Sequence, residues 1–206
     1  SAVFGVSATR IDPAARSVEL SNRQNLTYDA LLLGMGSVPQ VPDVRGIRLP
    51  GIHYLRTFDD AERLVQAAAA ARRAVVIGGG LIGLKISEAL ITRGVEVLLV
   101  VSSDRLLSRI TTPDDRDAVL RLIDSPGLHI LLNRDVVEIE GHGRAERVRL
   151  SGGESVHCDM VVVGKGVTPN LLCTRDTGVI TRRGVVVDDR MQTSVPGIYA
   201  AGDIAE

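Results

Sequence analysis

Three glycines near the middle of the chain have the spacing of a phosphate-binding turn. Gly78, Gly80 and Gly83 follow residues 74–77, an apolar run rich in β-branched residues, and precede a helix-forming segment. Between a strand and a helix, the first glycine of this spacing permits a tight turn, the second lets the backbone approach a pyrophosphate, and the third lets the helix pack closely on the strand. The N–H groups at the start of the helix would then face the phosphates of a dinucleotide, although such a turn also occurs without a ligand. The candidate residues are Gly78, Gly79, Gly80, Leu81, Ile82 and Gly83.

A residue that selects between NADH and NADPH is expected at the end of the following strand. An acid there, about 20 residues beyond the glycines, normally bonds the ribose 2′-OH of NADH. This chain has Val101 at that place, followed by Ser102, so selection for NADH is weakened. Asp104 lies close enough in sequence to replace the acid, whereas Arg105 or Arg109 could instead meet the 2′-phosphate of NADPH. We expect a slight preference for NADH and include Val101, Ser102, Asp104 and Arg105 in the site.

Only two of the 24 basic residues are lysines, and both fall in the predicted nucleotide site. Lys85 lies in the first turns of the glycine-rich helix, and Lys165 lies in Gly164-Lys165-Gly166, beyond a predicted strand at 160–163. Ligands of an open parallel sheet lie beyond the carboxyl ends of its strands, so both ammonium groups could reach one crevice. We interpret them as cations that flank the nicotinamide and favour negative charge on the cofactor. Alternatively, Lys85 only packs its stem and exposes its ammonium.

The elements that must position these residues predict an α/β protein with a parallel sheet. Buried parallel strands are expected at 74–77, 95–101 and 160–163. Helices are expected at 59–72, from the glycine turn to about Thr92, and at 113–123. A β-meander is expected between 128 and 163, before the closing strand. Further strands are expected at 2–10, 17–20, 28–33, 184–187 and 197–200.

Composition and charge exclude several other classes of protein. The net charge is −1 and 2% of the residues are aromatic, so neither nucleic acid nor an anionic membrane is expected as a partner. No apolar run approaches the roughly 18 residues of a membrane span, and we expect a cytoplasmic protein. Cys158 and Cys173 form no CxxC pair, and no cluster of His and Cys has metal-ligand spacing. We therefore expect no metal and two apolar core thiols.

Four motifs, in order along the chain, carry a resemblance to one family. They are residues 28–39 (YDALLLGMGSVP), 74–90 with the glycine turn, 159–170, and 193–203 (TSVPGIYAAGD). Over nearly its whole length the chain resembles the FAD-dependent pyridine nucleotide-disulfide oxidoreductases. Within that family, the run 80–85 is most similar to NADH oxidases and to the large subunits of nitrite reductases.

The resemblance implies a domain organisation and an activity. Residues 43–167 would form a Rossmann-like NAD(P)H-binding domain, and residues 1–42 and 168–206 would be partial FAD-domain segments. In the full-length parent, hydride would pass from NAD(P)H to FAD and on to an unidentified acceptor, and the cofactors would carry the chemistry. We therefore assign no catalytic side chain. The alternative is a module that senses NAD(P)H without catalysis.

The resemblance also implies a flavin site that other segments complete. Asp203 would bond the ribityl–phosphate region of FAD, with Gly202 beside it, and Gly36 would pass close to the flavin. The family's opening flavin fingerprint and its C-terminal interface domain have no counterpart in this sequence, so these segments are the expected partners, in a parent that is a homodimer. The chain departs from the family at Met35, usually threonine, and at Lys85, usually glutamate.

We predict that this chain binds a nicotinamide dinucleotide but no FAD, because the resemblance covers the whole nucleotide motif and only part of the flavin site. A purified preparation should be colourless, and its absorbance between 350 and 500 nm should stay at baseline. A yellow preparation with one bound flavin per chain would contradict this prediction.

Overall fold

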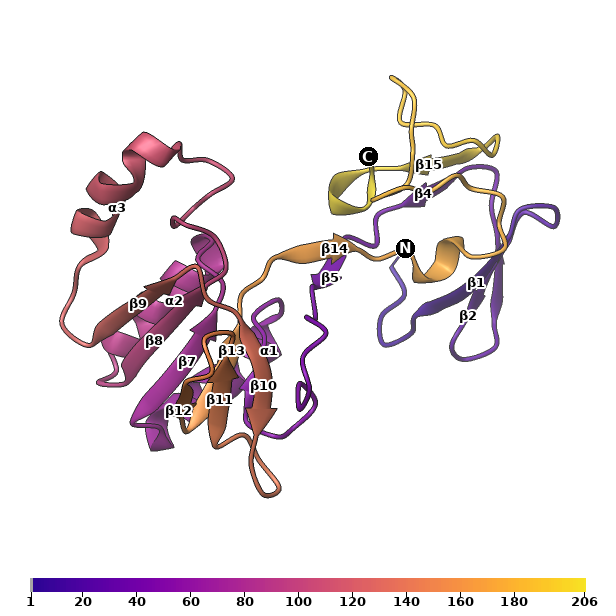
Figure 1. Cartoon of the computed structure of the whole chain (residues 1–206). Helices are drawn as coiled ribbons and strands as arrows, with labels where there is room; N and C mark the ends of the chain where they lie inside the picture. The colour runs from indigo at the N-terminus through magenta and orange to yellow at the C-terminus, as the bar shows by residue number, and fades with distance from the viewer. Residues whose placement is uncertain (1) are drawn as a thin grey trace. The chain divides into compact units, whose positions relative to one another are not determined.

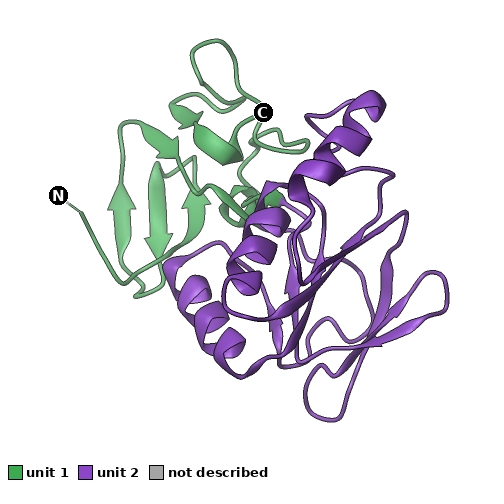
Figure 2. Cartoon of the chain, turned by 90° about the vertical axis from the view of Figure 1, so that its left-hand side faces the viewer, with its two compact units in different colours: residues 1–38, 167–206 green, residues 39–166 purple. Residues whose placement is uncertain are grey.

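A computed structural model describes residues 2–206 and divides the chain into two units. Unit 1 comprises residues up to 38 together with 167–206, and unit 2 comprises 39–166 (Figure 2). The sequence places the crossings at 42/43 and 167/168, and the structure changes unit at 38/39 and 166/167. Ser1 lies outside the described residues. Each unit has its own hydrophobic core.

A five-stranded parallel sheet forms the centre of unit 2. Its strand order is β6-β13-β7-β8-β9, and each neighbouring pair is parallel (Figure 1). Side chains of the inner strands are buried on both faces, which explains their continuous apolar sequence. The α/β class with a parallel sheet is therefore confirmed. The strands are β6 (Ile52–His53), β7 (Arg73–Ile77), β8 (Glu96–Val101), β9 (Leu128–Leu132) and β13 (Met160–Val163).

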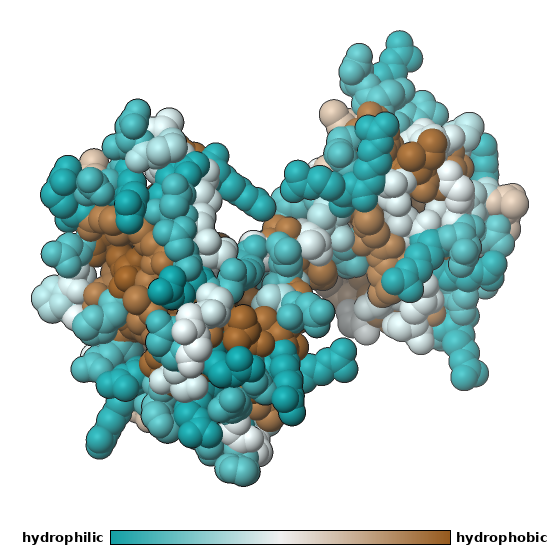
Figure 3. Space-filling model, in the orientation of Figure 1, coloured by the Kyte–Doolittle hydropathy of each residue, from teal (hydrophilic) through white to brown (hydrophobic). Residues whose placement is uncertain are grey.

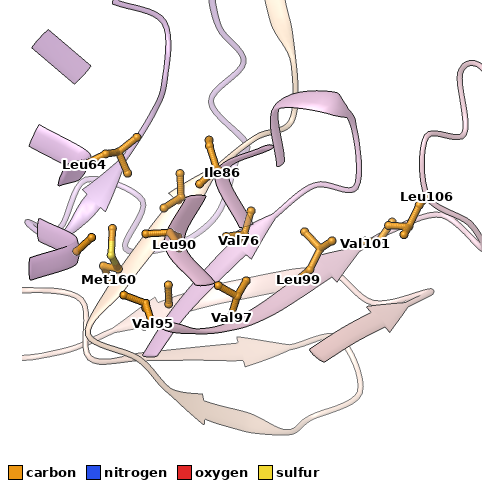
Figure 4. Packing of buried hydrophobic residues seen from close by; sticks show 13 residues of the cluster. Leu64, Val76, Ile86, Leu90, Val95, Val97, Leu99, Val101, Leu106 and Met160 are labelled. Atoms are coloured by element: carbon orange, nitrogen blue, oxygen red, sulfur yellow. The ribbon is translucent and has the colours of Figure 1, made fainter. Parts of the chain in front are cut away.

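Helices cover one face of this sheet. Helix α1 (Phe58–Ala70) begins with a capping box, in which Thr57 and Asp60 bond each other's backbone N–H groups. Helix α2 (Leu81–Ile91) ends where Gly94 adopts φ +79°, as expected for a C-terminal glycine. Helix α3 (Arg116–Ile123) follows a single 3-10 turn at Pro113–Asp115. Residues from α1, α2 and the sheet share one buried cluster, including Leu64, Val76, Ile86, Leu90 and Leu99 (Figure 4).

A small antiparallel sheet covers the opposite face. It consists of β10 (Val136–Glu140), β11 (Arg147–Leu150) and β12 (Ser155–His157), and its apolar side chains pack against Val75 and Ile77 of β7. Strand β7 thus sends alternate side chains to the helices and to the meander.

Strand β9 corrects the predicted extent of the meander. The sequence places every strand after residue 128 in the meander, but β9 pairs with β8 and extends the parallel sheet at its edge. The prediction was wrong because a short apolar strand has the same pattern in either setting. Apolar residues gather around β9 on the surface (brown in Figure 3), in agreement with the partial burial of Leu128, Ile130 and Leu132.

Unit 1 consists of short strands around a smaller core. An antiparallel sheet contains β1 (Ala8–Asp12), β2 (Ser17–Leu20) and β3 (Asn25–Thr27); β4 (Leu31–Leu33) pairs with β15 (Ile198–Ala200), and β5 (Ser37–Pro39) with β14 (Val167–Pro169). The predicted strand 184–187 is wrong: only isolated bridges form at Val185, because successive N–H groups bond different segments, that of Val185 to Ile204 and that of Val186 to Ile180. Likewise, the first strand begins at Ala8 and not at residue 2.

None of the helices within residues 2–206 has the length and apolarity that crossing a bilayer requires.

Leu99 provides a test of the core of unit 2. Its side chain is fully buried between sheet and helices, so Leu99→Ala should lower the free energy of unfolding by about 3 kcal/mol. Leu122→Ala is the matched control, because Leu122 on α3 is 85% exposed and its loss should change stability by less than about 0.5 kcal/mol. Urea unfolding followed by circular dichroism measures both, and equal effects would contradict the assigned core.

Candidate nucleotide-binding site

A cavity of about 420 Å³ lies at the carboxyl ends of β7, β8 and β13. Each strand continues there into a turn, and the three turns form the walls. Binding at this edge is the rule for open parallel sheets. The lining residues are Gly78 to Ile82, Val101, Ser102, Ser103, Leu107, Ser108, Arg109, Ile110, Gly164, Lys165 and Gly166. The structure therefore brings together ten of the residues predicted for the nucleotide site, from three separate segments of the chain.

Glycines at this edge allow backbone segments to touch. A Cβ atom on Gly83 would lie 1.9 Å from the carbonyl oxygen of Gly78, and a Cβ on Gly78, where φ is +114°, would lie 2.5 Å from that of Gly164. Both positions exclude a side chain, because real Cβ contacts are longer than 3.0 Å. Gly83 is accordingly buried beneath the turn and does not line the cavity.

Gly80 differs from the other glycines of the motif. A Cβ atom there would meet nothing within 4 Å, so the space beside it is open. Gly80 is also the N-cap residue of α2, which has no side-chain cap and no acid in its first turn. The N-terminal N–H groups and the positive end of the helix dipole thus face a cavity without a protein anion among the described residues that line it. This arrangement suits a phosphate group.

Val101 has a packing role at the end of β8. Its side chain is 3% exposed, and together with Leu106 it fills the space that a side chain on Gly79 would occupy. The backbone N–H of Leu107 donates to the Gly79 carbonyl oxygen at 2.8 Å, which ties the loop after β8 to the glycine turn. Ser102 lines the cavity beside Val101. Val101 therefore supports the turn from below and offers the ribose no polar group.

Asp104 and Arg105 do not line the cavity among the residues the structure describes. The Arg105 Nη1 donates to Asp104 Oδ1 at 2.8 Å, so the carboxylate predicted to replace the missing acid is paired with the guanidinium predicted to meet a phosphate. Arg109 does line the cavity, and it is exposed. Of the two arginines considered from the sequence, Arg109 is the one placed to contact a ligand.

The two lysines lie in different surroundings. Lys165 lines the cavity, and its Nζ donates to Asp135 Oδ1 at 2.8 Å. Lys85 lies on the exposed side of α2, where its Nζ donates to Glu88 Oε2 at 2.8 Å, and this bond raises the pKa of Lys85. The structure does not bring Lys85 to the described cavity lining.

Unit 1 holds the three residues predicted for the flavin. The Oγ of Ser37 donates to Asp203 Oδ2 at 2.7 Å, which joins two segments that lie 166 residues apart in the sequence. The carbonyl oxygen of Gly36 accepts from the N–H of Asn170. Gly36 and Gly202 both have positive φ, +64° and +80°. Sequence reasoning missed Ser37, which is 7% exposed. A polar residue directly after a predicted flavin glycine was the available signal.

A larger cavity, of about 810 Å³, lies at the opposite edge of the sheet. Arg73 pairs there with Glu96 at 3.3 Å, and the Asp159 carboxylate accepts from the backbone N–H groups of Arg72 and Arg73 at 2.8 Å. Burial raises the pKa of the Cys158 thiol there to about 11, so it is protonated at neutral pH. We place the candidate site at the carboxyl edge, because the glycine turn and the start of α2 lie there. Residues 2–206 contain no cluster of metal-ligating side chains.

Comparison with known proteins agrees with this geometry. The model of the pyridine nucleotide-disulphide oxidoreductase family matches residues 1–206. The chain belongs to this family. Rhodocoxin reductase of Rhodococcus erythropolis is 37% identical over 98% of this chain and 47% of its own length. The crystal structure of a ferredoxin reductase from Rhodopseudomonas palustris superposes with a TM-score of 0.93 at 33% identity, over 98% of this chain and 50% of that one.

A third relative in the family has been solved with its nucleotide. The water-forming NADH oxidase of Lactobacillus brevis, bound to NADH, is 27% identical with a TM-score of 0.86, over 97% of this chain and 46% of that one. An engineered form, in which an aspartate is lost and arginines are gained, was solved with NADPH. The chain spans about half the length of these oxidoreductase relatives.

Gly80 and Gly83 separate ligand binding from folding. Gly80→Ala should leave the unfolding temperature unchanged, because the added methyl enters open space, but it should weaken NADH binding by about tenfold or more by occupying the phosphate approach. Gly83→Ala should instead lower stability by roughly 1–3 kcal/mol, because α2 must move off the turn. Calorimetric titration and thermal unfolding of both variants check this, and a Gly80→Ala protein with wild-type affinity would contradict the site.

Proposed function

We propose that this chain is the NAD(P)H-binding part of an FAD-dependent oxidoreductase. The observation that carries the proposal is the uncapped N-terminus of α2 beside the open space at Gly80, at the edge where parallel sheets bind ligands. Family membership and the reductase names of the relatives support the redox activity. When bound, NAD(P)H supplies a hydride and FAD accepts it, and the electrons go on to an acceptor that differs among family members.

The side chains and backbone of this chain bind and orient the nucleotide. The N–H groups at the start of α2 hold the pyrophosphate, and the loop after β8 receives the adenosine ribose beside Ser102 and Arg109. The turn after β13 carries Lys165 along the same cavity. Ser37 and Asp203 fit the proposed flavin site, because their hydrogen-bonded pair is partly buried and joins the two motifs that carry the family resemblance there. The homodimeric parent and the cytoplasmic location stay predictions.

We further propose that NADH and NADPH bind with weak discrimination and that NADH is slightly favoured. Val101 leaves the ribose without a carboxylate, while the nearby Ser102 hydroxyl suits a 2′-OH and Arg109 suits a 2′-phosphate. Calorimetry should give dissociation constants that differ by less than about tenfold. Arg109→Met should weaken NADPH binding more than NADH binding. A preference for NADPH of tenfold or more would overturn this proposal, and no binding of either at millimolar concentration would overturn the proposed function.

Lys165 is proposed to favour hydride transfer electrostatically. It lines the cavity and is partly buried, with 27% of its side chain exposed, so its charge acts in a partly desolvated site. In the flavoenzyme that contains this chain, Lys165→Met should slow anaerobic flavin reduction by NADH, with folding intact. The position of Lys85 gives no support to the same role, so Lys85→Met is the matched control and should reduce flavin at the wild-type rate. Equal rates in all three proteins would show that Lys165 is an ordinary surface residue.

A further inference from the structure

Arg105 holds the loop after β8 through three groups of that loop. Its Nε donates to the Thr111 carbonyl oxygen at 3.2 Å, its Nη1 to the Asp104 carboxylate at 2.8 Å, and its Nη2 to the Ser108 carbonyl oxygen at 3.4 Å. The Ser103 hydroxyl donates to the Arg105 carbonyl oxygen at 2.7 Å. Only 21% of the Arg105 side chain is exposed. The guanidinium therefore bridges both ends of the segment 104–111.

This segment has a conformation that needs support. Leu107 has φ +53°, which is unfavourable for a residue with a branched side chain. The Thr111 hydroxyl bonds the carbonyl oxygens of Leu106 and Leu107 at 2.9 and 3.1 Å, and the Leu107 N–H bonds Gly79 at 2.8 Å. Arg105 and Thr111 thus fix a strained turn against the phosphate-binding glycines.

The same turn forms one wall of the nucleotide cavity. Its lining residues from this turn are Leu107, Ser108, Arg109 and Ile110. Arg105 is not one of the described residues that line the cavity. Any shift of the segment would move this wall and the Gly79 contact together. Arg105 therefore contacts this wall through the loop that it holds.

We propose that Arg105 is a positioning residue that shapes the nucleotide cavity, and that it is not a ligand for the ribose or the 2′-phosphate. The proposal deepens the nucleotide-binding function proposed above and rests on it. It requires that loss of Arg105 weaken NADH and NADPH binding by the same factor, because the wall serves both. A phosphate ligand would instead affect NADPH alone. It also requires the planar guanidinium, since one ammonium cannot bond two carbonyl oxygens and a carboxylate in that fork geometry.

The test measures the binding of NADH and NADPH by calorimetry and thermal unfolding in four proteins. Arg105→Met should weaken both nucleotides by about tenfold, with the ratio between them unchanged, because charged hydrogen bonds that fix the loop are lost. Arg105→Lys should recover only part of the loss. The matched control is Arg93→Met, which removes the bond from the Arg93 guanidinium, just after α2, to the Ala89 carbonyl oxygen; Arg93 is not among the described residues that line the cavity, so this variant should bind like wild type.

A double-mutant cycle separates positioning from a general loss of stability. Thr111→Val removes the other support of the turn, so its effect on the nucleotide dissociation constants should be non-additive with that of Arg105→Met. In the flavoenzyme, Arg105→Met should raise the KM for both nucleotides and leave kcat unchanged.

Two results would overturn the proposal while wild-type binding remains intact: a loss confined to NADPH, or an Arg105→Met protein with wild-type affinity for both nucleotides. If the wild-type chain binds neither nucleotide, the proposed function itself fails.

Discussion

The close approach of three backbone segments at Gly78, Gly83 and Gly164 sets the shape of the carboxyl edge of the sheet. A Cβ atom on Gly83 would lie 1.9 Å from the Gly78 carbonyl oxygen, and a Cβ atom on Gly78 would lie 2.5 Å from that of Gly164. Side chains at these positions would therefore push α2 away from β7 and β13. Each glycine costs about 0.5–1 kcal/mol of conformational entropy relative to alanine. Burial of apolar residues on both faces of the sheet offsets this cost. The cavity is thus a consequence of tight packing beneath it.

The two longest helices of unit 2 differ at their N-termini in a way that follows from sequence. Thr57 and Asp60 form a capping box at the start of α1, so side chains of the protein accept from the N–H groups of these two residues. Helix α2 begins at Gly80, which has no side chain to accept such a bond, and its first turn has no acid. The unsatisfied donors of α2 lie at the edge of the sheet where the cavity is. This helix end suits the phosphate groups of the proposed nucleotide.

The sequence predicted these features to different degrees. The glycine turn, the strands around it and the family were predictable, because glycine spacing and apolar runs are local and specific signals. The surroundings of Lys85 and Arg105 were not, because they depend on which face of a helix or loop a side chain occupies. Sequence distance placed Arg105 near the ribose, whereas its hydrogen bonds turn it back into its own loop. The strand expected at 184–187 failed because its backbone N–H groups bond two different segments, a tertiary arrangement that the local β pattern does not specify.

The residue at the end of β8 has a packing role in this chain. The residue at this position supports Gly79 from below, and Val101 fills that space as a buried apolar side chain. In the proposed site, contacts to the ribose therefore come from the loop that follows. Because that loop contains a strained residue at Leu107, its shape depends on Arg105 and Thr111, and the geometry of the ribose end depends on two side chains that never need to touch the nucleotide.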